Sequence, residues 1–228
     1  MSWKEDAKKR VAMEAVKLVK DDMIIGLGSG STAAYMIKEI GRLISEKGLR
    51  VLAVPSSSQA MLLAANSGVP VTTLDEHPVL DLVIDGADEI DKNFNMIKGG
   101  GGALLREKVV ASSAKQVVIV ADETKLVDKL GKFKVPIEVL PFGLAKVCAA
   151  IKELGGTPMV REGQRKMGPV VTDNGNYIVD ADFGLIDDVE KLDKQLKLIP
   201  GVLETGLFIG LAQIAYLGTK DGITKLKK

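Results

Sequence analysis

The sequence predicts an α/β protein that consists of a Rossmann-like parallel sheet with helices on both faces and a smaller ferredoxin-like α+β domain. Two observations carry this prediction. Apolar runs of strand length alternate with helical patterns in the first half of the chain, as they do in a parallel sheet with helical crossovers. Beyond Gly131 and Pro136 the order changes to strand, helix, strand, strand, helix, strand, which is the order of a ferredoxin-like module.

The elements of the first domain follow from a capping signal and from apolar runs. Ser2 and Glu5 have the spacing of a capping box, and the helix that they begin is expected to reach about Lys20. The segment from Leu207 to Leu226 is expected to return to this domain, which then comprises residues 1–130 and 207–228. Strands are expected at Met23–Leu27, Val51–Val54, Val69–Leu74, Leu82–Ile84 and Gln116–Val120, and helices at about Ser31–Glu46, Ser56–Asn66 and Gly102–Ala114.

The second domain is expected to comprise residues 131–206. The Asp173–Gly175 turn marks the middle of a hairpin within it. Its four strands form a sheet with edges, and exposed edges are usually covered or paired, so this domain is expected to contribute to a homo-oligomer. The strands are expected at Ile137–Leu140, Thr157–Arg161, Tyr177–Ala181 and Val202–Thr205, and the helices at Leu144–Leu154 and Val189–Leu198.

The composition excludes several classes of function. With 31 basic and 30 acidic side chains there is no net field to attract nucleic acid or an anionic membrane. No apolar run approaches the roughly 20 residues that span a bilayer. Cys148 is the single cysteine, which excludes an intrachain disulfide and fits a cytoplasmic protein. His77 is the single histidine, which argues against a zinc site or a serine–histidine triad.

Charged groups gather where a strand runs out and where a glycine run precedes a helix. Asp85 and Asp88 follow an apolar strand, and Lys98 stands before four glycines and a helix that carries Glu107. Open α/β sheets place ligand chemistry at such positions. The two aspartates lack the loop spacing of a metal site, and Lys98 would compete with a cation, so no metal is expected. Acid–base and hydroxyl-orienting roles fit better, and the alternative for Asp88 is that it only caps the turn.

Glu107 shares a helix face with apolar residues that include Leu104 and Val110. Leu105 and Val109 lie on the opposite side, so the helix is expected to pack on both sides. Desolvation raises the pKa of a carboxyl group, which makes Glu107 a candidate for proton transfer near neutral pH. The alternative is a structural ion pair with a buried lysine, which would also perturb its pKa.

The segment Gly26–Thr32 follows the first strand and opens a helix. Its backbone amides and hydroxyls are expected to form a cradle for an anion, most naturally a phosphate. The alternative is an ordinary strand-to-helix turn, which has the same sequence pattern. No lysine precedes Ser31, so it is not a Walker loop. The second strand ends without the acidic residue that binds an adenosine ribose, which favours a small phosphorylated ligand. Lys8 extends the apolar stripe of the first helix and points either to water or inward to this anion.

Seven segments in order, spread over nearly the whole chain, resemble ribose-5-phosphate isomerase of the A type. They are Gly28–Thr32, Val54–Ser58, Asp85–Ile90, Lys98–Gly101, Leu105–Lys108, Gly131–Phe133 and Val171–Asn176. The resemblance implies that D-ribose 5-phosphate and D-ribulose 5-phosphate are interconverted in the pentose phosphate pathway through an enediolate, without metal or organic cofactor. It also implies a homodimer or a homotetramer.

The resemblance further implies that Glu107 is the catalytic base, assisted by Asp85 and Lys98, and that Lys8 lies near the site. Residues Arg161–Pro169 form a longer segment than in the shortest family members, and little effect on catalysis is expected from it. Two other functions are considered: a phosphosugar-sensing module, which needs no base, and a coenzyme A transferase-like enzyme with Glu107 as nucleophile. The resemblance implies that the sugar phosphate is bound by Ser29, Gly30, Ser31, Thr32, Asp85, Gly86, Ala87, Asp88, Lys98, Gly99, Gly100, Gly101 and Lys125, and Lys8 is expected to bind it too.

Overall fold

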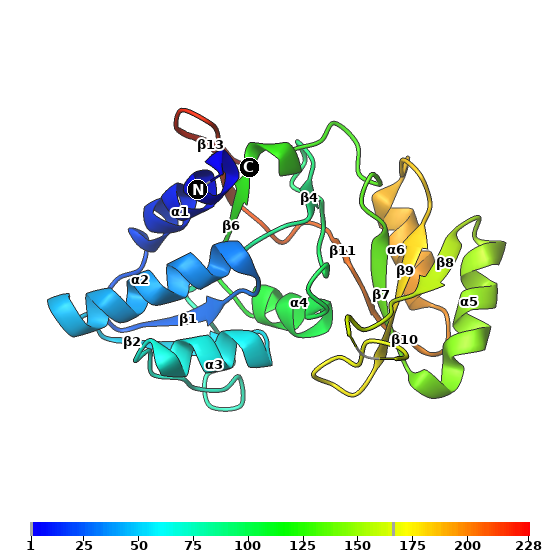
Figure 1. The fold of residues 1–228 in the computed structure, drawn as a ribbon, viewed down its shortest axis with the longest axis horizontal. Coiled ribbons are helices and arrows are strands. Elements are labelled where there is room, and N and C mark those ends of the chain that lie inside the picture. The colour runs from blue at the N-terminus through cyan, green and yellow to red at the C-terminus, as the bar shows by residue number, and fades with distance from the viewer. Residues whose placement is uncertain (1, 166) are drawn as a thin grey trace. The chain divides into compact units, whose positions relative to one another are not determined.

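The computed structural model describes residues 2–165 and 167–228, which fold into two compact units (Figure 1). The first unit comprises Met1–Ala87, Arg106–Leu126 and Leu211–Lys228, and the second comprises Asp88–Leu105 and Val127–Gly210. The sequence analysis assigned residues 88–105 to the first domain. In the structure they cluster with the second unit, because their short strands pair with a strand of that unit.

The first unit is built around a sheet with the order β13-β12-β6-β3-β1-β2. Neighbouring strands from β12 to β2 run parallel, and β13 is antiparallel at the edge. In this order β1 lies between the edge strand β2 and β3, with crossovers to both of its sides, and the parallel pairing confirms the predicted Rossmann-like class. The strands are β1 (Met23–Leu27), β2 (Val51–Pro55), β3 (Leu82–Asp85), β6 (Val117–Asp122), β12 (Ile214–Gly218) and β13 (Ile223–Lys227).

Helices cover both faces of this sheet, as the sequence predicts. Ile25 and Leu27 of β1 lie in one buried apolar cluster with residues of the first three helices. Gly26 points to the other face, where a Cβ atom would come within 2.6 Å of Val110 Cγ1 on the fourth helix. Alternate residues of one strand therefore contact helices on opposite faces. The helices are α1 (Trp3–Val16), α2 (Ser31–Lys47), α3 (Ser58–Asn66) and α4 (Leu104–Ser112).

The second unit contains the predicted ferredoxin-like module. Its larger sheet has the order β10-β7-β9-β8 and is antiparallel throughout, and α5 and α6 pack on it through a shared apolar core. The elements are β7 (Val135–Val139), α5 (Leu144–Glu153), β8 (Thr157–Val160), β9 (Tyr177–Asp182), α6 (Val189–Lys197) and β10 (Val202–Thr205). A second, short sheet joins β4 (Glu89–Ile90), β5 (Met96–Ile97) and β11 (Leu207–Phe208).

One predicted strand is wrong. Val69–Leu74 is not a strand: one isolated bridge joins Val71 to Ala53, and the chain then turns. Hydroxyl groups drive the turn, because the Thr72 side chain bonds to Glu76 and His77 instead of continuing a ladder.

The first helix also departs from the capping-box prediction. The side chain of Ser2 makes no capping hydrogen bond, and its backbone carbonyl accepts the N–H of Glu5 at 2.9 Å. The helix ends at Val16 rather than near Lys20. The N–H groups of Lys17, Leu18 and Val19 donate to carbonyls three residues back, as in a 3₁₀ turn, and Asp22 then adopts a left-handed conformation with φ +63°.

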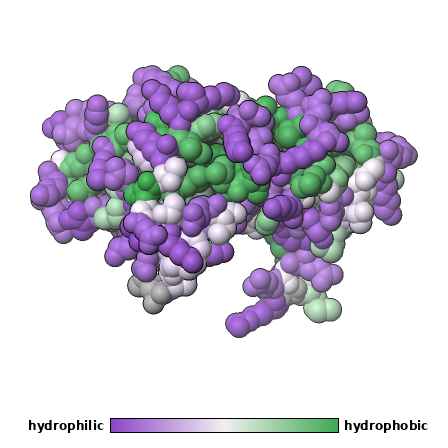
Figure 2. Space-filling view, turned by 90° about the horizontal axis from the view of Figure 1, so that it is seen from above, coloured by the Kyte–Doolittle hydropathy of each residue, from purple (hydrophilic) through white to green (hydrophobic). Residues whose placement is uncertain are grey.

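Figure 2 shows hydrophilic residues over much of the face in view, with apolar residues visible between them. Some large apolar side chains are nevertheless exposed in the second unit, including Phe142 at 97% and Leu198 at 81%. Among the residues that the structure describes, no helix is both long enough and apolar enough to cross a bilayer.

Candidate active site

The parallel strands of the first unit bring several predicted site residues to one edge of the sheet. Leu27 pairs with Pro55 and Ile84, and Asp85 pairs with Ile119. The carboxyl ends of β1, β2, β3 and β6 therefore lie side by side, and the segments that follow them form one rim. This rim carries Ser29, Ser56, Asp85 and Lys125.

Asp85 is the fixed acidic group of this rim. Its side chain is buried, with 2% of the residue exposed, and its Oδ1 accepts the N–H of Ser29 at 3.1 Å and that of Gly86 at 2.7 Å. Gly28 lies against it, so that a Cβ atom at position 28 would stand only 2.1 Å from Oδ1. The carboxylate is thus held in one orientation by backbone amides, in a space that only a glycine leaves open.

The loop from β1 to α2 is tied to the end of β2. The Ser29 hydroxyl lies 3.0 Å from Ser56 Oγ and donates to Ser57 Oγ at 2.6 Å, while the Gly30 N–H donates to Gln59 Oε1 at 3.2 Å. The amides of Ser29 and Gly30 are therefore already bound within the protein. The amides of the first turn of α2, which begins at Ser31, have no acceptor within their own helix. The anion cradle itself stays a prediction.

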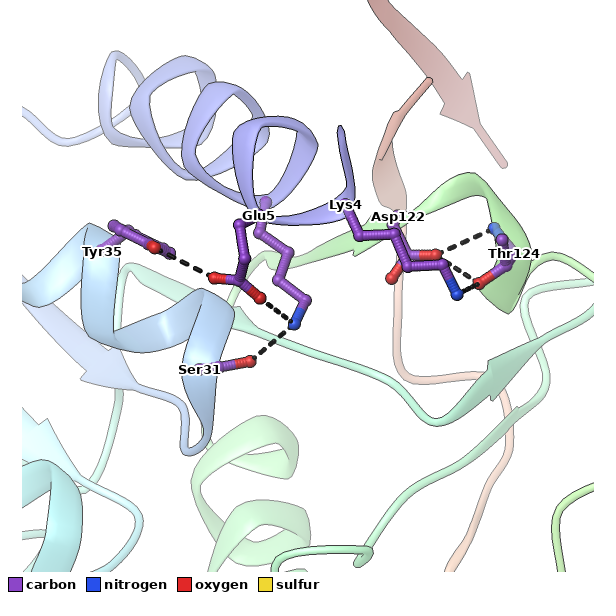
Figure 3. A network of polar contacts seen from close by, with 7 residues as sticks. Lys4, Glu5, Ser31, Tyr35, Asp122 and Thr124 are labelled. Atoms are coloured by element: carbon purple, nitrogen blue, oxygen red, sulfur yellow. Dashed lines mark hydrogen bonds and ion pairs between the residues drawn. The ribbon is translucent and has the colours of Figure 1, made fainter. Parts of the chain in front are cut away.

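Lys8 points inward to the start of α2. Its Nζ lies 3.1 Å from Ser31 Oγ and donates to Glu5 Oε1 at 2.9 Å, and the Tyr35 hydroxyl donates to Glu5 Oε2 at 3.0 Å (Figure 3). These contacts favour the anion-facing alternative over a side chain directed to water. The hydrogen bond from Lys8, joined by that from Tyr35, lowers the pKa of Glu5, and the carboxylate in turn raises the pKa of Tyr35. The sequence predicts Glu5 only as part of a capping box, and neither Glu5 nor Tyr35 as a residue near the site, although Glu5 lies three residues before Lys8.

Lys125 lies on a short 3₁₀ helix, η1 (Glu123–Lys125), that follows β6. Lys4 Nζ approaches Thr124 Oγ1 at 3.5 Å, and the N–H of Thr124 donates to Asp122 Oδ1 at 3.1 Å (Figure 3). Lys4 and Lys8 are one helical turn apart on α1. The elements that carry Lys8 and Lys125 are therefore neighbours at the same edge of the sheet.

Glu107 lies in the first turn of α4 and is buried, with 6% of the residue exposed. Leu104, Val110 and Ala111, which share its face, are buried as expected. The expectation that the helix packs on both sides is wrong for Val109, which is 46% exposed because it points away from the sheet that α4 covers. The raised pKa of Glu107 stays a prediction.

The second unit holds the remaining predicted residues, Asp88 and Lys98 to Gly101. Lys98 is buried, with 4% of the residue exposed, and its Nζ lies 5.3 Å from the centroid of the Phe208 ring. Asp88 Oδ2 accepts the N–H of Gly100 at 2.8 Å. Asp88 therefore caps the turn of the glycine loop, which is one of the two roles expected for it. The other role, the orientation of a hydroxyl group, stays a prediction.

One residue on this loop was missed by sequence analysis. Arg161, which directly follows β8, donates from Nη1 to the carbonyl oxygens of Gly99 at 2.8 Å and Gly100 at 3.1 Å. The guanidinium also binds the carboxylate of Asp180 on β9, with 2.8 Å from Nε to Oδ2. About sixty positions separate Arg161 from the glycines. The available signal was an arginine and an aspartate on two strands of one predicted hairpin.

Comparisons with known proteins point to one family. The model of the family "Ribose 5-phosphate isomerase A (phosphoriboisomerase A)" matches residues 52–222. The ribose-5-phosphate isomerase A of Methanothermobacter thermautotrophicus is 47% identical over 220 residues, covering 96% of this chain and 97% of that protein. That of Methanosarcina acetivorans is 50% identical over 219 residues, covering 96% of this chain and 93% of that protein.

Solved structures agree. Ribose 5-phosphate isomerase A from Methanocaldococcus jannaschii is 49% identical, with a TM-score of 0.95 over 98% of this chain and 99% of that one. A D-ribose-5-phosphate isomerase in complex with phospho-erythronic acid is 43% identical, with a TM-score of 0.97 over the full length of both chains. These matches support an isomerase over a sensing module or a coenzyme A transferase-like enzyme. The rim of the sheet, the glycine loop and α4 thus occur in a chain that belongs to the ribose 5-phosphate isomerase A family.

Proposed function

We propose that Glu107 is the catalytic base with which this chain interconverts D-ribose 5-phosphate and D-ribulose 5-phosphate. In the open-chain aldose, the carboxylate removes the proton from C2, and the electron pair moves to form an enediolate. The same carboxyl group returns the proton to C1, while the hydroxyl proton moves from O2 to O1. The observation that carries this proposal is the burial of Glu107 in an apolar helix face directly after the glycine loop, since burial favours the neutral acid and brings a carboxyl group toward the working pH.

The other groups of the reaction are assigned by their chemistry. We propose that Asp85, held by two backbone amides, assists ring opening or moves the hydroxyl proton between O1 and O2. Lys98 and the amides of the glycine loop stabilise the developing oxyanion, which is usually a large term in catalysis. Asp88 orients a sugar hydroxyl besides shaping the loop.

The phosphate group is proposed to bind at the start of α2. Ser31, Thr32 and the amides of this turn supply hydrogen-bond donors, and Lys8 and Lys125 supply positive charge on neighbouring elements. The complex of the related isomerase with phospho-erythronic acid supports a phosphorylated sugar as the ligand of this chain too. The carboxylate of that acid resembles an enediolate in its charge.

The proposal is tested by following the formation of ribulose 5-phosphate from ribose 5-phosphate with the purified protein. We expect the same turnover with and without EDTA, because the proposed steps need no metal. Absence of turnover in a folded sample would contradict the proposed function. Loss of turnover in EDTA that a divalent ion restores would instead show that Asp85 and Asp88 bind a metal.

Lys8→Ala is expected to raise KM for ribose 5-phosphate by about 10- to 100-fold with little change in kcat, because one hydrogen bond from a charged group is lost. Lys17→Ala is the matched control, since Lys17 directly follows α1 and pairs with Glu14 of that helix with the same three-residue spacing, but is exposed. Steady-state kinetics with ribose 5-phosphate and with unphosphorylated ribose measure the effect. An equal rise of KM for both sugars would contradict the phosphate-binding role and show that Lys8 has a structural role.

We also propose a homodimer or homotetramer that is built partly through the second unit. Leu140 and Phe142 lie next to the edge strand β10, because the Leu140 N–H donates to the Gly201 carbonyl at 2.8 Å. Leu140, Phe142, Leu198 and Leu203 are each exposed, and β10 is an edge strand of its sheet, so a second copy could cover these apolar side chains and pair with this edge.

Light scattering at micromolar concentration is expected to give a multiple of the 24.3 kDa chain mass. Phe142→Ser should weaken the assembly, whereas Leu62→Ser, at an exposed leucine of the first unit, should not. A mass of 24.3 kDa for the wild-type protein would contradict the oligomer.

A cytoplasmic location stays a proposal that rests on the single cysteine. Cys148 is partly buried, and burial raises the pKa of its thiol, so it is protonated near neutral pH. Cell fractionation with an antibody against the chain tests the location, and recovery in a secreted fraction would contradict it.

A further inference from the structure

The glycine loop at residues 98–101 is held from the ferredoxin-like sheet by one guanidinium group. Arg161 Nη1 donates to the carbonyl oxygens of both Gly99 and Gly100, at 2.8 and 3.1 Å. All of these residues belong to the second unit. The loop is further closed on itself, because the N–H of Gly102 donates to the Gly99 carbonyl at 3.0 Å.

These bonds fix the planes of two successive peptide groups. The peptide group between Gly99 and Gly100 is bound at both ends, its carbonyl by Arg161 and its N–H by Asp88. The next peptide group has its carbonyl bound by Arg161. Because a trans peptide is planar and its N–H points opposite to its C=O, the N–H of Gly101 is directed away from the guanidinium. Arg161 therefore holds the Gly99 and Gly100 carbonyls on the side of the loop that faces the guanidinium, and the Gly101 N–H on the opposite side.

The backbone shape of the loop makes such support necessary. Gly99 has φ +103° and Gly102 has φ +83°, which are conformations that glycine reaches without strain but does not prefer over others. Without side chains, four consecutive glycines have a large conformational entropy when they are not held. The orientation of the amides must therefore come from partners outside the loop, and the described contacts supply Arg161 and Asp88.

Arg161 is itself held in place by Asp180. Nε and Nη2 of the guanidinium bind the two carboxylate oxygens, and both side chains are largely buried. Asp180 lies within β9, whose pairing with β8 fixes its position in the sheet. The planar fork of an arginine binds the carboxylate on one edge and leaves Nη1 for the carbonyls, which a lysine cannot reproduce.

We propose that Arg161 and Asp180 are positioning residues of the isomerase, which direct the Gly101 amide, one of the amides of the glycine loop, toward the developing oxyanion. This inference rests on the proposed function, in which those amides stabilise the enediolate. It separates Arg161 from the rest of the segment 161–169, for which little effect on catalysis was expected. The small module thereby contributes to the chemistry through two side chains that need not touch the substrate.

The first test is the kinetics of Arg161→Met, which removes the guanidinium and keeps an apolar stem. We expect kcat to fall about 10- to 100-fold with little change in KM, because the amides act mainly in the transition state. Inhibition by inorganic phosphate should be unchanged, because the phosphate end of the site lies on other elements. Asp180→Asn should lower kcat in the same direction, and Arg161→Lys should not restore it fully.

The matched control is Lys197→Met. Lys197 also joins two elements of the second unit through partly buried ion pairs, with Glu204 at 3.1 Å and Asp193 at 3.5 Å, but neither partner belongs to the glycine loop. We expect this variant to lose thermal stability without losing kcat. If Arg161→Met loses no more kcat than Lys197→Met at a similar change in Tm, or if KM rises and kcat does not fall, Arg161 is a structural tie and the proposal is wrong.

Two further measurements separate this proposal from the proposed function. The site of Arg161 opens into a hollow of about 340 Å³ that Gly100, Lys132 and Lys134 also line. Millimolar guanidinium should therefore partly restore kcat in Arg161→Ala and leave the kcat of Lys197→Met unchanged. Amide exchange at Gly100 should be faster in Arg161→Met than in the wild type. If the wild type shows no isomerase turnover, the proposed function fails, and unchanged exchange at Gly100 would also overturn the positioning role of Arg161.

Discussion

Glu107→Gln is expected to lower kcat for ribose 5-phosphate by about 10²- to 10⁴-fold, the usual effect of losing a general base. Glutamine has nearly the same shape as glutamate but cannot take a proton from C2. The affinity for ribose 5-phosphate, measured by calorimetry on the inactive variant, should stay within a few-fold of the wild-type KM.

Glu138→Gln is the matched control for removing a buried carboxylate. Glu138 is fully buried in the second unit, where its Oε1 accepts hydrogen bonds from Thr172, Asn174 and Asn176. We expect this variant to change Tm and to leave kcat nearly unchanged. Near-normal turnover in a folded Glu107→Gln sample would exclude Glu107 as the base.

The second large effect is expected at Gly28, which contacts no reacting atom in the proposed mechanism. A methyl group there would stand 2.1 Å from Oδ1, 2.3 Å from Cγ and 2.5 Å from the Cα of Asp85, so Gly28→Ala must displace the backbone as well as the side chain. The hydrogen bonds from the Ser29 and Gly86 amides would then be lost or distorted. Since a misplacement of about 1 Å can cost about 10²-fold in rate, we expect kcat to fall by about that factor.

Gly222→Ala controls for the substitution itself. Gly222 lies in the turn between β12 and β13, has no positive φ, and a Cβ atom there would meet nothing within 4 Å. It should therefore keep wild-type kinetics. Steady-state assays of both variants, with circular dichroism to confirm folding, decide the matter: wild-type kcat in Gly28→Ala would show that the position of Asp85 is not critical.

The fold was predictable where burial follows a simple period. The parallel strands of the first unit are buried on both faces and read as continuous apolar runs, and the helices between them show a helical pattern. The strand predicted at Val69–Leu74 is wrong, because its apolar residues have the pattern of a strand while the hydroxyls of Thr72 and Thr73 bind Glu76 and favour a turn. The strands β4, β5 and β11 are only two residues long, too short for any period to be visible.

The residues of the candidate site could be proposed from the sequence where their chemistry follows from their position along the chain. Asp85 ends a strand, Ser31 begins a helix and Lys8 lies on an apolar stripe, so each could be identified before any contact was known. Arg161 could not, because its role depends on the direction of one side chain toward carbonyls about sixty residues away. Glu5 and Tyr35 were missed for the same reason, since hydrogen bonds between side chains of two helices leave no periodic signal.

The order of segments in the first unit has a consequence for biosynthesis. β12 pairs with β6 inside the sheet, yet the whole stretch 127–210 of the second unit is translated between them. At about 5–20 residues per second, β6 waits on the order of ten seconds on the ribosome without this neighbour. The nascent chain therefore carries an open apolar sheet edge while the second unit is already able to fold, and the Rossmann-like sheet closes only after β12 has emerged.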